Sequence, residues 1–325
     1  KTINFHKKNE MTLIFLPPGQ HFRSMYREMK NNYYRFIETF KAPFKGRSLL
    51  NWIDWTPSEI ETLLNLAFQV KAEAHRGEIH QRFLGKTIAL IFEKRSTRTR
   101  SSFETAFGEE GGHPVFMSTD DIQLGGKESV KDTARVLGRM FSAIEFRGFK
   151  QEHVEQLAEF SGIPVINGLT DDFHPTQALA DIMTLKESFE ELKGLHLAYC
   201  GDGRNNVARS LMLICAKMGI DFSVYSPKEL FPHKDIIEIC KPFAEISRAK
   251  IQISDKIDVV KGADALYTDV WVSMGEPEEV WVFLKSLPQA ALFWGRLRQA
   301  FFTFFPGRRS PAGRYSFPGC SWQGQ

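Results

Sequence analysis

The 325-residue chain carries 42 Lys and Arg against 39 Asp and Glu, a net charge of +3 at pH 7. Hydrophobic residues make up 42% and charged residues 25%, which is ordinary for a globular enzyme and excludes a disordered chain. The length predicts about two domains, and no apolar run approaches the ~20 residues that a membrane helix needs.

The four cysteines indicate a reducing compartment. Cys200, Cys215, Cys240 and Cys320 show neither a CxxC pair nor the spacing of metal ligands, and the first three lie in apolar sequence. This pattern is typical of reduced, structural thiols. We therefore expect a cytoplasmic protein whose cysteines hold no metal.

Charge divides the chain into a body and a tail. From Val280 onward there is no Asp or Glu but there are six Lys or Arg, so the tail carries +6 and the body −3. At the other end, residues 1–45 are basic and irregular, which predicts an N-terminal extension. The expected domains are residues 46–188 and 189–279, followed by an atypical basic and aromatic tail at 280–325.

The first regular element predicted is a helix that begins after Thr56. Thr56 suits the N-cap, Pro57 the first helical position, and Glu59 the third position of a capping box. Its apolar face is then marked by Ile60, Leu63, Leu64, Ala67 and Val70.

An anion site is predicted where an apolar strand at residues 87–91 meets a helix expected at 101–110. The junction holds three hydroxyls and a guanidinium, on Ser96, Thr97, Thr99 and Arg98. The first N–H groups of a helix lack intrahelical partners and the helix dipole favours negative charge, so this junction suits a phosphate. A solvated basic turn is the alternative.

Strands and helices alternate along the rest of the body, which is the pattern of parallel α/β sheets. The expected strands are 114–117, 143–146, 163–166, 195–200, 221–225 and 265–268, and the expected helices are 129–141, 152–160, 175–187 and 207–218. A polar loop at 118–127 carries Gln123. The predicted fold class is α/β with two doubly wound parallel-sheet domains, the second incomplete or altered toward the C-terminus.

Strand ends and helix starts supply the other candidate residues. Arg147 follows the strand at 143–146, and His174 lies at the cap of the next helix with Gln177 in its first turn. Because ligands gather at the carboxyl edge of parallel sheets, a catalytic His174 is favoured over a structural one. A turn at 201–206 resembles a dinucleotide motif only weakly, since Asn206 replaces the third glycine.

Asn205 and Asn206 instead suit donors to a small polar ligand. Asp269, after the strand at 265–268, suits an ammonium group with assistance from Ser273. Spacing alone favours equally the alternative that Asp269 caps the next element.

Four segments together resemble the carbamoyltransferases: Ser96-Thr97-Arg98-Thr99, the strand end at Arg147, His174-Pro175-Thr176-Gln177, and Asp269…Ser273-Met274-Gly275. The last of these segments resembles the ornithine branch of the family in particular. The resemblance covers residues 44–279. It implies transfer of a carbamoyl group from carbamoyl phosphate to the δ-amine of L-ornithine, giving L-citrulline and phosphate. It also implies a homotrimer with active sites between subunits, and the implied reaction needs neither a metal nor an organic cofactor. We expect no nucleic-acid or membrane partner.

The resemblance further implies residue roles. Ser96, Thr97, Arg98 and Thr99 would hold the phosphate, with Gln123 reaching it from a neighbouring subunit. Arg147, His174 and Thr99 would act on the carbamoyl oxygen and Gln177 on the carbamoyl nitrogen. The α-groups of ornithine would be fixed by Asn206, Asp269, Ser273 and Met274.

The sequence departs from the family pattern after Glu279. A His-Cys-Leu-Pro motif, a late arginine and a closing helix are expected there, and the tail instead carries Phe301-Phe302-Thr303-Phe304-Phe305 and Arg308-Arg309. A shifted reading frame, a divergent folded replacement, and a segment for anionic surfaces are the alternatives. Alternative functions are a catalytically impaired relic, a binding protein that retains only the carbamoyl phosphate pocket, or a carbamoyltransferase for another amine.

Overall fold

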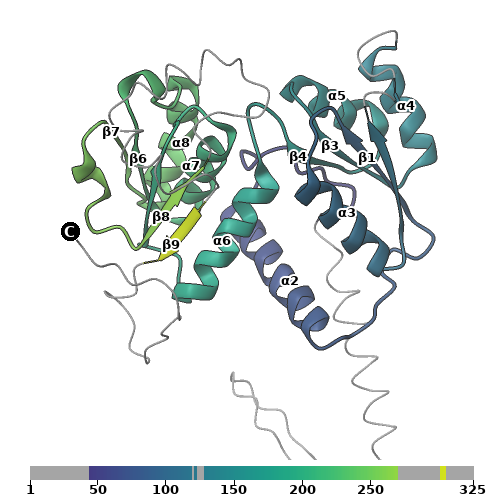
Figure 1. The fold of residues 1–325 in the computed structure, drawn as a ribbon, viewed down its shortest axis with the longest axis horizontal. Helices are drawn as coiled ribbons and strands as arrows, with labels where there is room; N and C mark the ends of the chain where they lie inside the picture. The colour runs from purple at the N-terminus through teal and green to yellow at the C-terminus, as the bar shows by residue number, and fades with distance from the viewer. Residues whose placement is uncertain (1–43, 119–120, 123–127, 270–300, 305–325) are drawn as a thin grey trace, which may run out of the picture. The chain divides into compact units, whose positions relative to one another are not determined.

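The structure, a computed structural model, describes residues 44–118, 121–122, 128–269 and 301–304 (Figure 1). The expected N-terminal extension, most of the loop at 118–127, and most of the tail lie outside these residues.

The first sheet has four parallel strands in the order β2-β1-β3-β4 (Figure 1). Its strands are β1 (Thr87–Phe92), β2 (His113–Ser118), β3 (Ala143–Arg147) and β4 (Val165–Leu169). Its helices are α2 (Pro57–His75), α3 (Thr97–Glu109), α4 (Val130–Met140), α5 (Gln151–Ser161) and α6 (Pro175–Phe189). Phe92 pairs with both Ser118 and Arg147, so three strands end at the same level.

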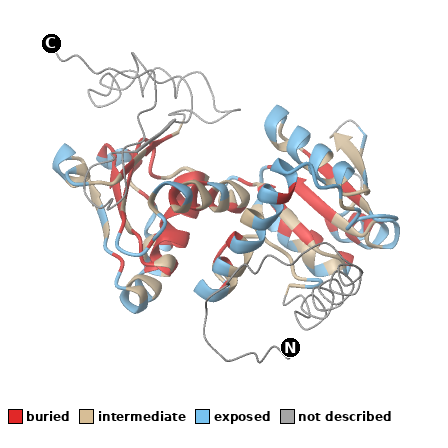
Figure 2. Ribbon diagram, turned by 90° about the horizontal axis from the view of Figure 1, so that it is seen from below, coloured by how far each residue is buried: buried red, intermediate tan, exposed pale blue. Residues whose placement is uncertain are grey.

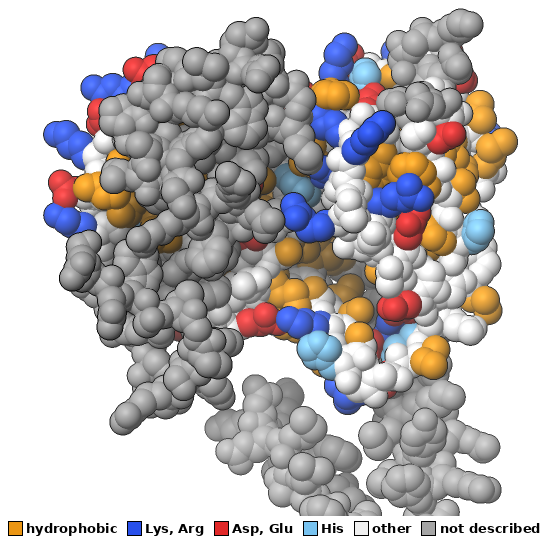
Figure 3. Space-filling model, viewed as in Figure 1, with side chains coloured by type: hydrophobic (Ala, Val, Ile, Leu, Met, Phe, Trp, Pro, Cys, Tyr) orange, Lys and Arg blue, Asp and Glu red, His pale blue; other side chains and the backbone are white. Residues whose placement is uncertain are grey.

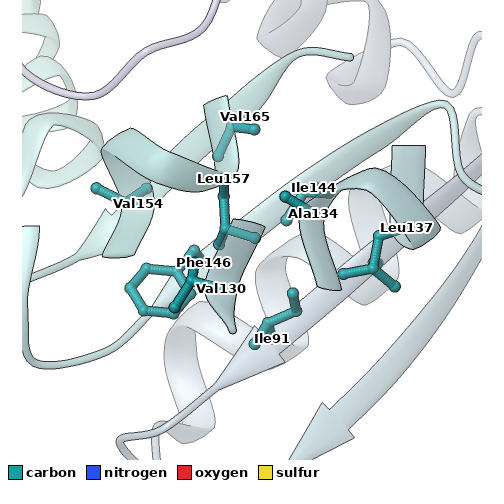
Figure 4. Close-up of a cluster of buried hydrophobic side chains, with 10 residues drawn as sticks. Ile91, Val130, Ala134, Leu137, Ile144, Phe146, Val154, Leu157 and Val165 are labelled. Carbon is teal, nitrogen blue, oxygen red and sulfur yellow. The ribbon is translucent and has the colours of Figure 1, made fainter. Parts of the chain in front are cut away.

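One face of this sheet packs against α4 and α5. Figure 4 shows the buried cluster, to which β1, β3, β4 and both helices contribute. Its labelled residues are Ile91, Val130, Ala134, Leu137, Ile144, Phe146, Val154, Leu157 and Val165. Of the four inward positions that the apolar period predicts for α4, Val130, Ala134 and Leu137 are buried, whereas Phe141 caps the C-terminus of α4 and is half-buried. Burial of such apolar area, at roughly 25 cal/mol per Å², holds the helices on the sheet and fixes the strand ends that carry the site.

The second sheet has the order β7-β6-β5-β8-β9. Its strands are β5 (His196–Cys200), β6 (Asp221–Tyr225), β7 (Ile251–Ser254), β8 (Ala265–Thr268) and β9 (Phe301–Phe304). Its helices are α7 (Asn206–Met218) and α8 (Lys234–Ser247), with short 3-10 turns η1 (Lys228–Leu230) and η2 (Ile257–Val260). Buried residues follow these strands and α7 (Figure 2).

The edge strand β9 runs antiparallel to β8, whereas the other four strands are parallel. Phe301 pairs with Thr268, and Phe304 pairs with Ala265. The predicted fold class is confirmed, because both sheets are built from parallel α/β units. The altered C-terminal part of the second sheet takes the form of this antiparallel edge strand.

The predicted start of α2 is confirmed in atomic detail. Thr56 accepts from the backbone N–H of Glu59, and the Glu59 carboxylate accepts from the N–H of Thr56, which completes a capping box. Ile60 and Leu64 are buried as expected, but Val70 is exposed, so the helix buries a shorter apolar face than predicted.

Backbone carbonyls before α2 are held by a lysine of α7. Lys217 Nζ donates to the carbonyls of Ile53 (2.8 Å) and Trp55 (2.9 Å), and it lies 3.6 Å from the centre of the Phe243 ring. Trp52 Nε1 donates to the carbonyl of Pro175 at 3.1 Å. The bond from Trp52 therefore holds the first turn of α6, and the bonds from Lys217 hold the segment before α2 against α7.

Among the described residues, no helix has both the length and the apolar character to cross a membrane. Basic and acidic side chains are interspersed over the described surface on the face that Figure 3 shows. Cys200, Cys215 and Cys240 are buried and free, and burial raises the pKa of Cys200 and of Cys240 to about 12.

Candidate functional site

The helix after β1 begins four residues earlier than predicted, and this changes the site. α3 starts at Thr97 rather than 101, because the Ser96 hydroxyl caps it by accepting from the N–H of Thr99 at 3.2 Å. Thr97, Arg98 and Thr99 therefore form the first helical turn instead of the loop before it. Arg98 is exposed, and Thr99 is half-buried.

Arg147 ends β3 next to this turn. Its side chain is buried, and Nη1 donates to Oγ1 of Thr99 at 3.3 Å. Burial lowers the pKa of Arg147, the carboxyl of Glu145 opposes this, and the positive charge of Arg98 lowers it further. Two guanidinium groups thus lie close enough to repel each other, which favours an anion between them.

Glu93 holds the backbone that follows Arg147. Its own N–H donates to the carbonyl of Arg147 (2.8 Å), and its carboxylate accepts from the N–H of Phe149 (2.9 Å) and lies 3.2 Å from Nδ1 of His153. A Cβ at Gly148 would overlap the Glu93 carboxylate. Glu93 was not among the predicted site residues, although its place before the hydroxyl-rich turn was a usable signal.

Glu145 lies beneath Arg147 as a fully buried carboxyl. Residues two apart on a strand share a face, so both side chains point to the same side of the sheet. Burial raises the pKa of Glu145 well above its ordinary value, and the positive charge of Arg147 opposes this shift.

His174 caps α6, as predicted, and its surroundings keep it neutral. Its N–H donates to Oγ of Ser210 on α7 (2.8 Å), and its ring Nδ1 lies 3.3 Å from Oγ1 of Thr176. His174 is half-buried, and protein atoms closely surround its ring. Burial lowers the pKa of His174 to about 3, and the guanidinium of Arg147 lowers it as well.

Gln177 lies one turn into α6, and its amide is already oriented. Nε2 donates to Oδ1 of Asp181 at 2.9 Å, whereas Oδ2 of Asp181 is buried and has no hydrogen-bond partner among the described residues. Burial raises the pKa of Asp181 to about 7. Asp181 was not predicted from the sequence, although its place one helical turn after Gln177 was a usable signal.

Two of the predicted ligands of the second domain, Asn206 and Asp269, lie near the start of α7. Asn205 caps α7 by accepting from the N–H groups of Val207 (2.7 Å) and Ala208 (3.2 Å), and its Nδ2 donates to Oδ2 of Asp269 at 3.2 Å. Nδ2 of Asn206 donates to the carbonyl of Thr170 at 2.6 Å. The structure thus brings Asn206 to the loop that leads into His174.

Four of the predicted residues lie near one another. Nη1 of Arg147 donates to Thr99, the charge of Arg98 lowers the pKa of Arg147, and the charge of Arg147 lowers the pKa of His174. In the described part of the chain, no carboxylate forms an ion pair with Arg98. Gln123, Ser273 and Met274 lie outside the described residues.

Two other features contain none of the predicted site residues. A surface hollow of about 580 Å³ at the end of α4 and α5 is lined by Arg135, Arg139, Phe160 and their neighbours. Glu73, Glu78 and His80 could hold a metal ion by distance, but the charge of Glu73 is already paired with Arg82.

Family models match both halves of the chain. The model described as the carbamoyl-P binding domain of aspartate/ornithine carbamoyltransferase matches residues 47–187. The model described as the Asp/Orn binding domain of the same proteins matches residues 193–291. The chain belongs to the aspartate/ornithine carbamoyltransferase family. The predicted family and enzyme class, a carbamoyltransferase, are therefore confirmed.

Relatives of this carbamoyltransferase are ornithine carbamoyltransferases by name. That of Caldanaerobacter subterraneus subsp. tengcongensis is 63% identical over 233 residues, which is 71% of this chain and 74% of the relative. That of Thermotoga maritima is 56% identical over 236 residues, or 72% of this chain and 75% of the relative.

Solved structures of the family have the same fold. The ornithine carbamoyltransferase from Pyrococcus furiosus matches with a TM-score of 0.72 and 43% identity, over 74% of this chain and 77% of that one. The anabolic ornithine carbamoyltransferase from Campylobacter jejuni matches with a TM-score of 0.68 and 39% identity, over 73% and 77%.

Proposed function

We propose that this carbamoyltransferase moves the carbamoyl group of carbamoyl phosphate to the δ-amine of L-ornithine, giving L-citrulline and phosphate. The observation that carries the proposal is that the charge of Arg98, in the first turn of α3, acts on Arg147, while the charge of Arg147 acts on a neutral His174. The names of the relatives support ornithine as the acceptor.

Phosphate binding is assigned to the first turn of α3. The side chains of Thr97 and Arg98 are exposed at this turn, where the helix dipole favours an anion. Ser96 and Thr99 add hydroxyls, although Ser96 also caps the helix. Each charge-assisted hydrogen bond from Arg98 is worth roughly 1.5–3 kcal/mol. We further assign Gln123 of a neighbouring subunit to the same phosphate, which requires a homotrimer.

Stabilisation of the developing oxyanion is assigned to Arg147, His174 and Thr99. Because His174 is neutral at pH 7, one ring nitrogen donates and the other accepts. A Thr176 hydroxyl that donates to Nδ1 leaves the proton on Nε2, which then donates to the carbamoyl oxygen. Each such donor is typically worth about 10²–10³ in rate. Gln177 is assigned to the carbamoyl nitrogen.

Ornithine binding is assigned to Asn206, Asp269, Ser273 and Met274. The Asp269 carboxylate suits the α-ammonium group, and the amide of Asn205 already holds one of its oxygens. Because α7 begins beside the loop that carries His174, the amino acid would lie next to the carbamoyl group. Holding both reactants in line supplies much of the remaining rate enhancement.

The reaction needs only groups that the two substrates and this chain provide. The neutral δ-amine attacks the carbamoyl carbon, a C–N bond forms, and the carbonyl electrons move to oxygen. The oxyanion collapses, the C–O bond to phosphate breaks, and phosphate leaves with that electron pair. The amine proton passes to the departing phosphate. We place this reaction in the cytoplasm and in arginine metabolism.

The test is citrulline formation by the whole chain. We expect citrulline and phosphate in equal amounts from carbamoyl phosphate and L-ornithine, and no product when L-aspartate or L-lysine replaces ornithine. Carbamoyl phosphate binding without citrulline formation would instead identify a binding protein that keeps only the first pocket. Product formation with aspartate alone would overturn the choice of amine.

A further inference from the structure

Three polar side chains form a row along the first two turns of α6. His174 caps the helix, Gln177 lies in its first turn, and Asp181 lies one turn further in. Residues three or four positions apart lie on the same face of a helix, so the row leads inward from His174. Gln177 is half-buried, whereas Asp181 is only 6% exposed. The inner end of the row is therefore closed to water.

The bond between Gln177 and Asp181 selects one of the two orientations of the Gln177 amide. Nε2 of Gln177 donates to Oδ1 of Asp181 at 2.9 Å. A carboxylate accepts at both oxygens and has no donor, so it binds the NH2 end of an amide and repels the oxygen end. Oε1 of Gln177 consequently lies on the side of the amide away from Asp181, and no donor among the described residues bonds to it.

We propose that Asp181 is a positioning residue that turns the amide oxygen of Gln177 toward the carbamoyl nitrogen, and that it thereby sets a preference for a carbamoyl over an acetyl phosphate. The inference rests on the proposed function, because the assignment of Gln177 to the carbamoyl nitrogen comes from there. The NH2 group of carbamoyl phosphate has two donors and suits an acceptor, whereas the methyl group of acetyl phosphate has neither donor nor acceptor.

Burial makes the opposite orientation of the amide unfavourable. If the amide turned round, its N–H groups would face the N–H groups of the substrate, and its oxygen would face the carboxylate of Asp181. Ala178, Ile182 and Leu185 are the apolar buried residues beside Asp181 on α6, so water does not supply the missing partners. A buried polar group without a partner costs free energy, and the orientation in the structure avoids this cost.

A stabilising role does not explain the carboxyl at this position. A Gln–Asp pair one turn apart stabilises a helix slightly when it lies on the surface. Burial raises the pKa of Asp181 to about 7, so the folded structure opposes ionisation of this group. Ionisable groups with such shifted pKa values gather at functional sites. The cost of burying Asp181 and the orientation of Gln177 together favour positioning.

The experiment compares two phosphonates that do not hydrolyse. Phosphonoacetamide keeps the NH2–CO group of carbamoyl phosphate, with CH2 in place of the bridging oxygen, and 2-oxopropylphosphonate has a methyl group in place of the NH2. Calorimetry at pH 8, above the pKa of Asp181 of about 7, gives both dissociation constants. In the unaltered chain we expect phosphonoacetamide to bind at least ~5-fold more tightly, as one hydrogen bond provides. Other differences between the two ligands are common to all variants and cancel when this selectivity is compared.

Asp181→Leu removes the acceptor and keeps a branched side chain. The freed amide then turns its donors toward the open site, so the selectivity should fall below ~2-fold. Asp181→Asn restores an acceptor without a charge and should keep the selectivity within ~2-fold of the unaltered value. Thr184→Val is the matched control, because it removes a hydroxyl from the next turn of α6, where Oγ1 of Thr184 donates to the carbonyl of Ala180 at 2.9 Å. It should leave the selectivity unchanged.

A second variant separates orientation of the amide from folding. Gln177→Met removes the amide itself and should lose the selectivity while Asp181 is still present. When Asp181→Leu is added to Gln177→Met, no further loss should follow, because both changes remove the same contact to the ligand. Additive losses would show that Asp181 acts by another route and overturn the inference. If Asp181→Leu does not fold, Asp181→Ala, which adds no volume, takes its place in both measurements.

Selectivity that persists in Asp181→Leu, with or without a lower melting temperature, makes the pair structural and overturns the inference. The same holds if the unaltered chain shows no selectivity, if Thr184→Val loses it, or if Asp181→Asn loses as much as Asp181→Leu. A chain that binds neither phosphonate and forms no citrulline refutes the proposed function together with the inference. Citrulline formation with unchanged selectivity in the Asp181 variants refutes the inference alone.

Discussion

Replacing Asp181 by Asn should make the protein more stable, and increasingly so as the pH rises. An unfolded chain ionises Asp181 near pH 3.8, whereas burial moves the pKa in the folded chain to about 7. Between these values the unfolded state holds fewer protons, so a rise in pH favours unfolding. Asn keeps an acceptor for Gln177 and does not titrate.

The magnitude follows from the two pKa values. A difference of one pKa unit corresponds to 1.36 kcal/mol, so the full shift corresponds to about 4 kcal/mol. Between pH 4.5 and 8, linkage predicts that the variant gains about 3 kcal/mol relative to the unaltered chain. All other titrating groups are common to both proteins and cancel in the difference.

Urea unfolding at pH 4.5, 6 and 8, followed by tryptophan fluorescence, measures this difference. Trp52 reports on α6, because its indole N–H donates to the carbonyl of Pro175. Asp235→Asn is the control: Arg209 holds the pKa of Asp235 below 3.8, so its difference should stay flat over the same range. A flat difference for Asp181→Asn would show that Asp181 is ionised in the folded protein and refute the reasoning.

Three further changes test the site and the core. Arg98→Ala should abolish the rise in melting temperature that carbamoyl phosphate produces, while Arg100→Ala keeps it; an unchanged rise would remove the phosphate assignment. Asp269→Asn should weaken binding of L-norvaline, which keeps the α-groups of ornithine but has no δ-amine, at least ~10-fold and spare binding of inorganic phosphate; equal loss of both would make Asp269 structural. Gly138→Ala should lower the unfolding free energy by ~1–3 kcal/mol, because its Cβ would overlap a backbone oxygen of α5, whereas Gly108→Ala, with open space, should not. Comparable stability of the two glycine variants would contradict the close approach of α4 and α5.

Local signals in the sequence predicted most elements of the fold. The capping box at Thr56 and the proline after His174 predicted two helix starts, and apolar runs identified β1 to β6 and β8 but neither β7 nor β9. α3 was predicted to start late, because its first turn is polar and gives no apolar period. Residues 226–264 carried no expected element, although they form α8 and β7. Pro242, inside α8, is a residue that ordinarily ends a helix.

The site residues that lie in short sequence motifs were predictable. The hydroxyl-rich turn, Arg147 and His174 each stand beside a recognisable strand or helix end. The hydrogen bond from Asn206 to the carbonyl of Thr170 was not predictable, because it depends on how α7 packs against the loop before α6. The neutral state of His174 likewise follows from burial and from Arg147, and no sequence spacing reveals it.

The direction of β9 decides which of its ends lies near Asp269. Because β9 enters beside Thr268 and leaves beside Ala265, its first residue lies at the carboxyl edge of the parallel strands and its last residue at the amino edge. A parallel strand in that place would have reversed the two ends. The backbone of Phe301, rather than that of Phe304, therefore lies on the side of the sheet at which β8 leads into Asp269.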